Sequence, residues 1–159
     1  WLFDVDLDHI QVVVQPKSII HSMVEFVDGA VMAQLGTPDM KLPIQYALYY
    51  PHRRYLPGER LDFKTLTEIT FEEPDMETFL GLSMAMEASR RGGSMPTVFN
   101  AANERAVAKF LHGQIGFLDI YRSIREAMDR HQVIEHPCLE EILETEAKTY
   151  EWMESRWSV

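Results

Sequence analysis

The sequence predicts an α+β protein, with a small β-sheet in its first third followed by a bundle of helices. β-Branched and aromatic residues cluster between positions 10 and 35, on both sides of the dipeptide Asp28-Gly29, which is typical of a hairpin. Beyond Asp75, apolar residues recur at the spacing of amphipathic helices. With 46% hydrophobic residues in 159, the chain can bury the core of one medium domain or two small ones.

The turn of the hairpin predicts its register. Asp-Gly adopts the positive φ angles of a two-residue type I′ turn, so Val27 is expected to face Ala30, and His21 then lies opposite Gly36. Because side chains alternate across a sheet, the hairpin has two faces. The face expected to join the core holds Ser22, Val24, Phe26, Val31, Ala33 and Leu35. The mixed face, expected to border a cleft or a partner, holds His21, Met23, Glu25, Met32 and Gln34.

The remaining elements follow in order. Residues 10–14 read as a third, more buried strand, residues 36–40 as a loop and residues 44–48 as part of a short helix. Residues 51–65 show neither period, and residues 69–71 are expected to form a last short strand. Four helices are predicted at 76–91, 95–112, 118–131 and 138–155, with Asp75 and Ser94 as N-caps and Gly92-Gly93 closing the first. Short loops favour a small antiparallel bundle.

Charge and composition exclude several classes of partner. The chain has 15 Lys and Arg against 25 Asp and Glu, and this net charge of −10 repels nucleic-acid phosphates and anionic lipid. No apolar stretch approaches the ~20 residues that span a bilayer. We therefore expect neither a nucleic acid nor a membrane as partner. The single Cys138 is compatible with a reducing compartment.

Some side chains that resemble chemical sites have a simpler interpretation. Asp4, Asp6 and Asp8 imitate the start of a calcium-binding EF-hand loop, but His9 and Gln15 stand where that loop needs Gly and Glu. No calcium site is expected there.

Three further groups of polar residues also have simple interpretations. His131 and His136 are expected to be exposed to solvent, and Cys138 to be an ordinary, partly buried thiol. One turn of the second bundle helix carries three polar residues that either bind a ligand or, more simply, form a polar stripe or a hydrogen-bond network. They are Asn100, Asn103 and Glu104.

His21 is the strongest candidate for chemistry. Its predicted place is opposite a glycine and beside the loop that contains Pro38 and Met40. There a histidine either transfers a proton near neutral pH, or holds an anionic substrate, or has a purely structural role. The chain contains no glycine-rich nucleotide loop, no nucleophile elbow and no paired-cysteine zinc motif. A complete active site is therefore not expected within it.

Several segments closely resemble the 1-deoxy-D-xylulose 5-phosphate reductoisomerase family. They are residues 18–26 (SIIHSMVEF) followed by Asp28-Gly29, residues 33–44 (AQLGTPDMKLPI), residues 66–74 (LTEITFEEP), residues 100–104 (NAANE) and residues 115–120 (IGFLDI). The resemblance extends over essentially the whole chain. It covers only part of the family's length, since the NADPH-binding Rossmann domain and the metal-binding catalytic segment have no counterpart here.

The resemblance implies an organisation in three parts. Residues 1–50 would end an α/β catalytic and dimerisation domain, of which the hairpin is a remnant, residues 51–74 would be a connector, and residues 75–159 a C-terminal domain like a four-helix bundle. His21 matches an active-site histidine of the family, and Pro38 and Met40 match the loop that closes beside the nicotinamide and the substrate.

The resemblance also implies an activity. The intact enzyme would use NADPH to convert the sugar phosphate 1-deoxy-D-xylulose 5-phosphate to 2-C-methyl-D-erythritol 4-phosphate, on the non-mevalonate route to isoprenoids. Mg²⁺ or Mn²⁺ would act as a Lewis acid. The enzyme would be a homodimer in the cytoplasm, or in the plastid stroma of a eukaryote. Neither NADPH nor a metal ion is expected to bind this segment alone.

One departure from the family concerns the turn before the hairpin. Where the family reads His-Pro-Gln-Ser, this chain has Gln15-Pro16-Lys17-Ser18, so a neutral amide replaces a titratable ring.

The alternative hypothesis for the function of the chain is a stand-alone, non-catalytic assembly module in which the hairpin self-associates.

Overall fold

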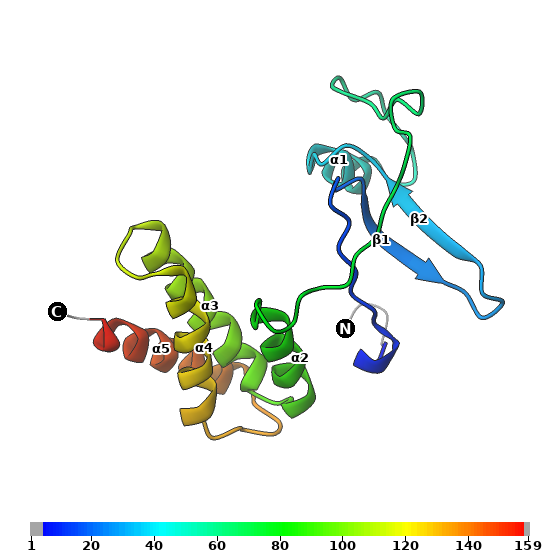
Figure 1. Ribbon diagram of the computed structural model, residues 1–159. Helices are drawn as coiled ribbons and strands as arrows, with labels where there is room; N and C mark the ends of the chain where they lie inside the picture. Colours follow the sequence, from blue (N-terminus) through cyan, green and yellow to red (C-terminus); the bar gives the residue numbers. More distant parts are fainter. Residues whose placement is uncertain (1–4, 158–159) are drawn as a thin grey trace. The chain divides into compact units, whose positions relative to one another are not determined.

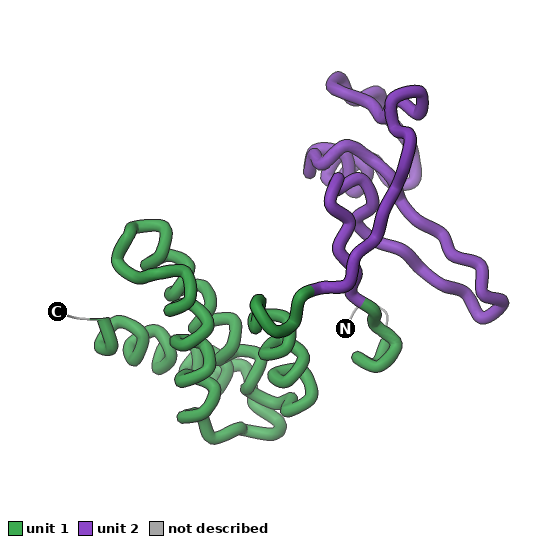
Figure 2. The backbone as a smooth tube through the Cα atoms, viewed as in Figure 1, with its two compact units in different colours: residues 1–11, 75–159 green, residues 12–74 purple. Residues whose placement is uncertain are grey.

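A computed structural model of the chain describes residues 5–157. The chain divides into two compact units (Figures 1 and 2). Unit 1 combines the segment that ends at Gln11 with residues 75–159, and unit 2 comprises Val12–Pro74. Residues 51–74, expected to be a separate connector, thus belong to the same unit as the hairpin. The three sequence-based ranges stay a prediction about the domains of the intact protein.

Unit 2 contains a two-stranded antiparallel sheet and one helix (Figure 1). Strand β1 spans Ile20–Glu25, strand β2 spans Val31–Leu35, and helix α1 spans Lys41–Tyr49. The hairpin, the loop at residues 36–40 and the short helix are as predicted. The segment from Tyr50 to Pro74 has no helix or strand, which agrees with its lack of a hydrophobic period.

The predicted register of the hairpin is wrong by one residue. Glu25 pairs with Val31, because the loop contains three residues, Val27, Asp28 and Gly29, instead of two. Gly29 adopts a φ of 82°, and the Asp28 carboxylate accepts a hydrogen bond from the backbone N–H of Ala30 at 3.0 Å. This is a type I turn closed by a left-handed glycine, the usual three-residue hairpin.

The predicted division of the hairpin into a core face and an open face is also wrong. The shift places Val24 beside Met32 on one face, and Met23 beside Ala33 on the other. Both faces are exposed, with Val24 58% and Phe26 49% accessible. A two-stranded ribbon has no second layer of its own to bury either face.

The predicted third strand does not form. Val14 makes a single antiparallel bridge with Glu72, and Ile10, Val12 and Val14 remain largely exposed. The expected strand at residues 69–71 does not form either, since the bridge lies at Glu72, just beyond it. The apolar run at residues 10–14 therefore contributes one backbone bridge and no strand.

Unit 1 consists of a short 3₁₀ turn, η1 (Leu7–His9), and four helices. These are α2 (Gly81–Arg91), α3 (Met95–Leu111), α4 (Phe117–Arg130) and α5 (Leu139–Arg156). Helix α3 packs against the three others, and their shared core contains the fully buried side chains Met84, Met95, Val98, Ile124, Met128 and Met153. The sequence predicted these helices within one residue at every boundary, except the start of α2.

Both predicted N-caps differ from the expectation. Asp75 accepts hydrogen bonds from the N–H groups of Glu77 and Thr78, which lowers its pKa, but the turn that it closes ends before α2 begins at Gly81. Ser94 occupies the N-cap position of α3 without a capping bond, because its hydroxyl group is used elsewhere. Gly92, with a φ of 64°, ends α2 as predicted.

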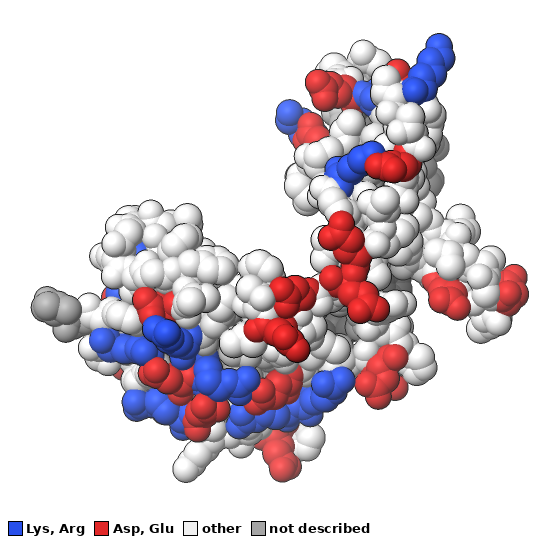
Figure 3. Space-filling model, in the orientation of Figure 1, with Lys and Arg blue, Asp and Glu red and all other residues white. Residues whose placement is uncertain are grey.

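The surface of unit 1 carries interleaved charges (Figure 3). Arg125 pairs with Glu87 at 2.8 Å, and Lys109 pairs with Glu154 at 2.7 Å. The hydrogen bond from Arg125 is the main reason why the pKa of Glu87 is lowered. No helix within the described residues has the length and apolar character needed to cross a bilayer.

Candidate active site

His21 lies at an irregularity of the hairpin. Ile20 pairs with Leu35 and Ser22 pairs with Gln34, so His21 is the extra residue of a β-bulge and has no direct partner on β2. The expectation that it faces Gly36 is wrong, since the backbone N–H of Gly36 bonds the carbonyl of Ile19 at 3.0 Å. A bulge twists the strand and re-aims a side chain, and bulges are frequent beside active sites. His21 is exposed.

The turn before β1 is held by Gln15. Its Oε1 accepts a hydrogen bond from the N–H of Ile19 at 2.7 Å, and Ser18 adopts a φ of 53° within the turn. Lys17 donates a hydrogen bond to the carbonyl of Glu68 at 3.3 Å. The amide Nε2 of Gln15 is buried without a partner among the described residues. The amide that replaces the family's histidine thus helps to set the start of the strand that carries His21.

The loop after β2 is anchored on both sides. Gly36 is buried, and an added Cβ would lie 3.3 Å from Gln34 Nε2 and 3.8 Å from Leu42 Cδ1, which leaves little room for a side chain. Thr37 reaches the carbonyl of Glu59 at 3.5 Å. Pro38 and Met40 are exposed, and Met40 immediately precedes α1. The backbone bond between Gly36 and Ile19 brings this loop close to the start of β1, so His21 and Pro38 lie at the same end of the hairpin.

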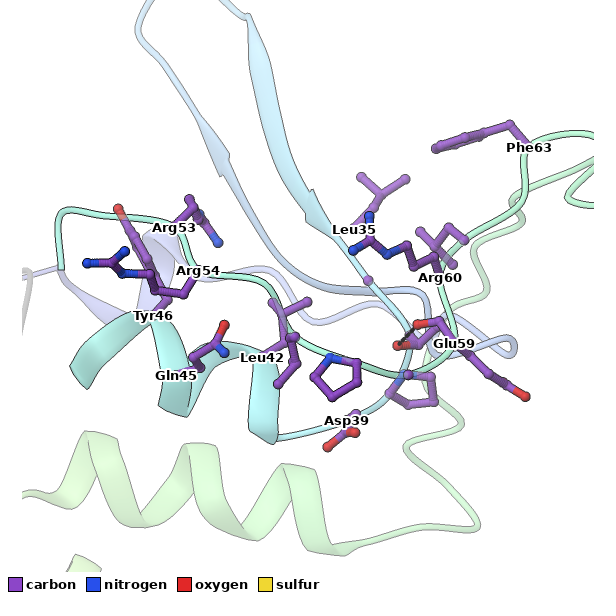
Figure 4. Close-up of a pocket in the computed structure, with 17 residues that line it drawn as sticks. Leu35, Asp39, Leu42, Gln45, Tyr46, Arg53, Arg54, Glu59, Arg60 and Phe63 are labelled. Atoms are coloured by element: carbon purple, nitrogen blue, oxygen red, sulfur yellow. Dashed lines mark hydrogen bonds between the residues drawn. The ribbon is translucent and has the colours of Figure 1, made fainter. Parts of the chain in front are cut away.

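A cavity of about 710 Å³ lies between this loop, α1 and residues 53–63; we call it the connector cavity (Figure 4). Pro38 lines it, whereas His21 and Met40 do not. Its apolar lining includes Leu35, Leu42, Leu56, Leu61 and Phe63. Three arginines also line it, Arg53, Arg54 and Arg60. The sequence signal for this group is the set of charged residues between His52 and Arg60, a segment that by its pattern predicts only a connector.

The described residues hold no cluster of metal-ligating side chains. No three His, Cys, Asp or Glu side chains among residues 5–157 lie close enough to share a metal ion. Asp4, the first carboxylate of the pattern that imitates a calcium loop, lies outside the described residues. Asp6 and Asp8, the other two, are exposed, and Asp8 pairs with Arg90. No glycine-rich turn precedes a helix N-terminus in the way that a bound phosphate requires.

Asn100 and Glu104, two of the three polar residues predicted to lie on one turn of α3, belong to a hydrogen-bond network. Asn100 donates a hydrogen bond to Glu104 at 3.3 Å, and the hydroxyl of Tyr150 donates to Glu104 at 2.7 Å and to Glu146 at 3.1 Å. The bond to Glu104 is the main reason why the pKa of Tyr150 rises to about 12. This confirms the hydrogen-bond interpretation for Asn100 and Glu104 and adds Tyr150, whose part no local pattern indicated.

His131 was expected to be exposed, and this is wrong. It is half-buried, and its Nε2 lies 2.6 Å from the hydroxyl of the fully buried Ser94. Burial, and then the charge of Arg91, lower the pKa of His131. His136 is exposed as predicted, and Cys138 is exposed instead of partly buried.

The sequence model of the family described as the DXP reductoisomerase C-terminal domain matches residues 35–152. The chain belongs to this family. The 1-deoxy-D-xylulose 5-phosphate reductoisomerase of Lachnospira eligens is 61% identical over 157 residues, and that of Agathobacter rectalis is 59% identical over 157 residues. Each alignment covers 99% of this chain and 41% of the relative. The chain thus spans about two fifths of the length of these reductoisomerases.

Solved reductoisomerase structures have the same fold over this part. The enzyme of Zymomonas mobilis in complex with NADPH matches with a TM-score of 0.88 at 41% identity, over 99% of this chain and 42% of that one. A reductoisomerase in complex with NADPH, fosmidomycin and magnesium matches with a TM-score of 0.90 at 38% identity, over 98% of this chain and 40% of that one. The predicted α+β class with a C-terminal helical domain is confirmed.

Proposed function

We propose that this chain is part of an NADPH-dependent reductoisomerase that converts 1-deoxy-D-xylulose 5-phosphate to 2-C-methyl-D-erythritol 4-phosphate in isoprenoid biosynthesis. The observation that supports this most strongly is the identity of 59–61% to reductoisomerases over 99% of the chain. Identity of this extent favours the enzyme over a stand-alone assembly module. By the same reasoning from bacterial relatives, the protein works in the cytoplasm.

The cofactor and the metal ion belong, in this proposal, to the part of the enzyme that the chain does not span. NADPH would supply the hydride, and Mg²⁺ or Mn²⁺ would polarise the substrate oxygens. The described residues offer no carboxylate cluster and no phosphate loop, so they do not fit either group by themselves. The contribution of this chain is the end of the hairpin with its loop.

His21 is proposed to act as a proton donor or acceptor, or to hold the anionic substrate, with Pro38 and Met40 closing beside it. Three features support this: the bulge that frees His21 from its neighbours on β2, its exposure, and the backbone bond that ties the loop to the base of the same strand. A histidine has both uses near neutral pH. Its position on an exposed strand makes it dispensable for packing.

The test is the His21→Ala variant of the intact enzyme. Turnover, followed by the loss of NADPH absorbance, is expected to fall by about 10²–10⁴, the usual size of a general acid–base or positioning contribution. The melting temperature should change little, because His21 is exposed. His136→Ala, which removes another exposed histidine, is the matched control and should keep wild-type turnover. Activity of His21→Ala within about twofold of wild type would return His21 to a structural role.

The intact enzyme is also proposed to be a homodimer. Exposed apolar residues on both faces of the hairpin, including Met23, Val24 and Val31, support this, since such surfaces are usually covered by another layer or subunit. Light scattering of the intact enzyme at micromolar concentration should give twice the mass of one chain. A monomer mass would contradict the proposal.

A further inference from the structure

The basic residues of the connector cavity differ from most others in this acidic protein. Acidic residues outnumber basic ones by ten, and many basic side chains of the described residues pair with a carboxylate. Arg53, Arg54 and Arg60 form no ion pair with any described carboxylate. All three line the same cavity.

Each of these guanidinium groups is held by an aromatic ring. Arg53 lies over the ring of Tyr46 at 3.7 Å, and Arg54 lies over the ring of Tyr49 at 5.6 Å. Arg60 likewise lies 5.5 Å from the ring of Tyr55. A guanidinium that stacks through its flat face keeps the N–H groups of its edge free to bind an anion in bidentate fashion. The stacking thus prepares these groups for an anionic ligand.

The walls of the cavity are joined by hydrogen bonds. Gln45 of α1 donates to the carbonyl of Tyr55 at 3.1 Å, and Thr37 reaches the carbonyl of Glu59 at 3.5 Å. Figure 4 shows Arg60 beside Leu35 at one end and Arg53 with Arg54 beside Tyr46 at the other. Leu42 lies between these ends, and further leucines belong to the lining. A ligand that fits has an apolar body and an anionic end.

Two carboxylates also line the cavity. Asp39 is already engaged, since it pairs with the Lys41 ammonium group at 3.6 Å and accepts a bond from the Lys41 N–H. Glu59 contributes a negative charge near Arg60. The end formed by Arg53 and Arg54 therefore has the more positive environment.

We propose that the connector cavity binds an organic phosphate, with the phosphate held by Arg53 and Arg54 and the apolar body lying along Leu42 and Leu35. The charges of two arginines that line the same end of the cavity match a doubly charged phosphate better than a single carboxylate. This proposal goes beyond the proposed reaction, because binding at the cavity does not depend on catalytic turnover. The site adjoins the loop of Pro38, which lines the same cavity.

The test is calorimetric titration of the intact enzyme with hexyl phosphate, with inorganic phosphate and hexanol as comparison ligands. Hexyl phosphate is expected to bind saturably at one site per chain, inorganic phosphate more weakly and hexanol not at all. The double variant Arg53→Gln with Arg54→Gln should bind hexyl phosphate at least about tenfold more weakly, the loss expected when charge-assisted hydrogen bonds are removed. Both side chains are exposed, so the variant should fold normally.

A matched control is Arg105→Gln. Arg105 also lies over a tyrosine ring, that of Tyr150 at 4.1 Å, but it does not line the cavity. This variant should bind hexyl phosphate like wild type. Absence of saturable binding, or binding that the double variant leaves unchanged, would overturn the proposal.

The phosphate has two possible sources, the substrate of the proposed reaction and a separate organic phosphate, and kinetics separates them. If the substrate supplies the phosphate, hexyl phosphate competes with the substrate, and the double variant has a higher KM for the substrate than the wild type. If a separate organic phosphate is the ligand, hexyl phosphate inhibits or activates non-competitively, and the KM of the double variant for the substrate equals that of the wild type. Both outcomes support the site. An enzyme without reductoisomerase activity would contradict the proposed function and leave the binding measurement valid.

Discussion

Ser94 joins three segments of unit 1 through one residue. Its N–H donates to the carbonyl of Ile134 at 3.0 Å, and its Oγ accepts from the N–H of Ile134 at 2.9 Å. The same hydroxyl lies 2.6 Å from Nε2 of His131. Because Ser94 is completely buried, its hydroxyl must find these partners within the protein. The residue therefore holds the loop after α4 against the junction of α2 and α3.

This contact predicts a pH dependence of stability. Burial and then the charge of Arg91 lower the pKa of His131 below the ordinary value of 6.5, so the folded state binds fewer protons than the unfolded state just below that pH. The stability that the neutral ring contributes is complete above about pH 6.5 and decreases as the pH falls through the lowered pKa.

The measurement is denaturant unfolding of the wild type and His131→Gln between about pH 5 and pH 8. The unfolding free energy of the wild type should fall relative to the variant as the pH decreases. His136→Gln removes an exposed histidine and should follow the wild type. Parallel pH profiles for the wild type and His131→Gln would show that the pKa of His131 does not differ between the folded and unfolded states.

At the scale of elements, the junction of α2 and α3 depends on two adjacent glycines with different surroundings. Both have positive φ, 64° at Gly92 and 53° at Gly93. A Cβ at Gly92 would meet nothing within 4 Å, whereas one at Gly93 would lie 2.2 Å from the carbonyl oxygen of Ile134. Only Gly93 is required by both its conformation and the close approach of another backbone.

These surroundings predict unequal costs of substitution. Gly92→Ala should lower the unfolding free energy by about 1–3 kcal/mol, because its φ of 64° and ψ of −158° lie in a backbone region that side chains other than glycine rarely adopt. Gly93→Ala should lower it by about 2–5 kcal/mol, because a clash with backbone adds to the same strain. Denaturant titrations of the two variants give the difference directly. Equal losses would mean that the loop at Ile134 moves aside at little cost.

At the scale of the whole molecule, the two units contain very different amounts of buried core. The buried core lies almost entirely among α2 to α5, whereas most large apolar side chains of the hairpin are exposed. The chain also spans only about two fifths of its relatives. The two units therefore differ in how much of their packing this chain supplies.

This division predicts the behaviour of the 159-residue chain on its own. It should neither bind NADPH tightly nor oxidise it in the presence of substrate and Mn²⁺, because its described residues offer neither a phosphate loop nor a cluster of metal ligands. Titration followed by NADPH fluorescence, with the intact enzyme as positive control, is the measurement. Saturable binding at micromolar NADPH, or turnover, would show that the cofactor site lies at least partly within this chain.

The sequence by itself determined the features that depend on neighbouring residues. Helices α3, α4 and α5 follow from apolar residues three and four positions apart, and Gly92 ends α2 because its conformation suits only glycine. The membership in the reductoisomerase family also followed from short linear motifs. His21, Pro38 and Met40 were selected by the same motifs, and their roles stay predictions.

The tertiary structure decided what depends on distant residues. Ser94 lies 37 positions from His131 in the sequence, so no local pattern indicated that its hydroxyl group bonds His131 instead of capping α3. The arginines of the connector cavity form a candidate site because the fold of α1 places the ring of Tyr46 against Arg53, which the sequence alone does not indicate. Each of these outcomes depends on which side chains come into contact once the helices and loops have packed. The hydrophobic periodicity of the sequence does not specify those contacts.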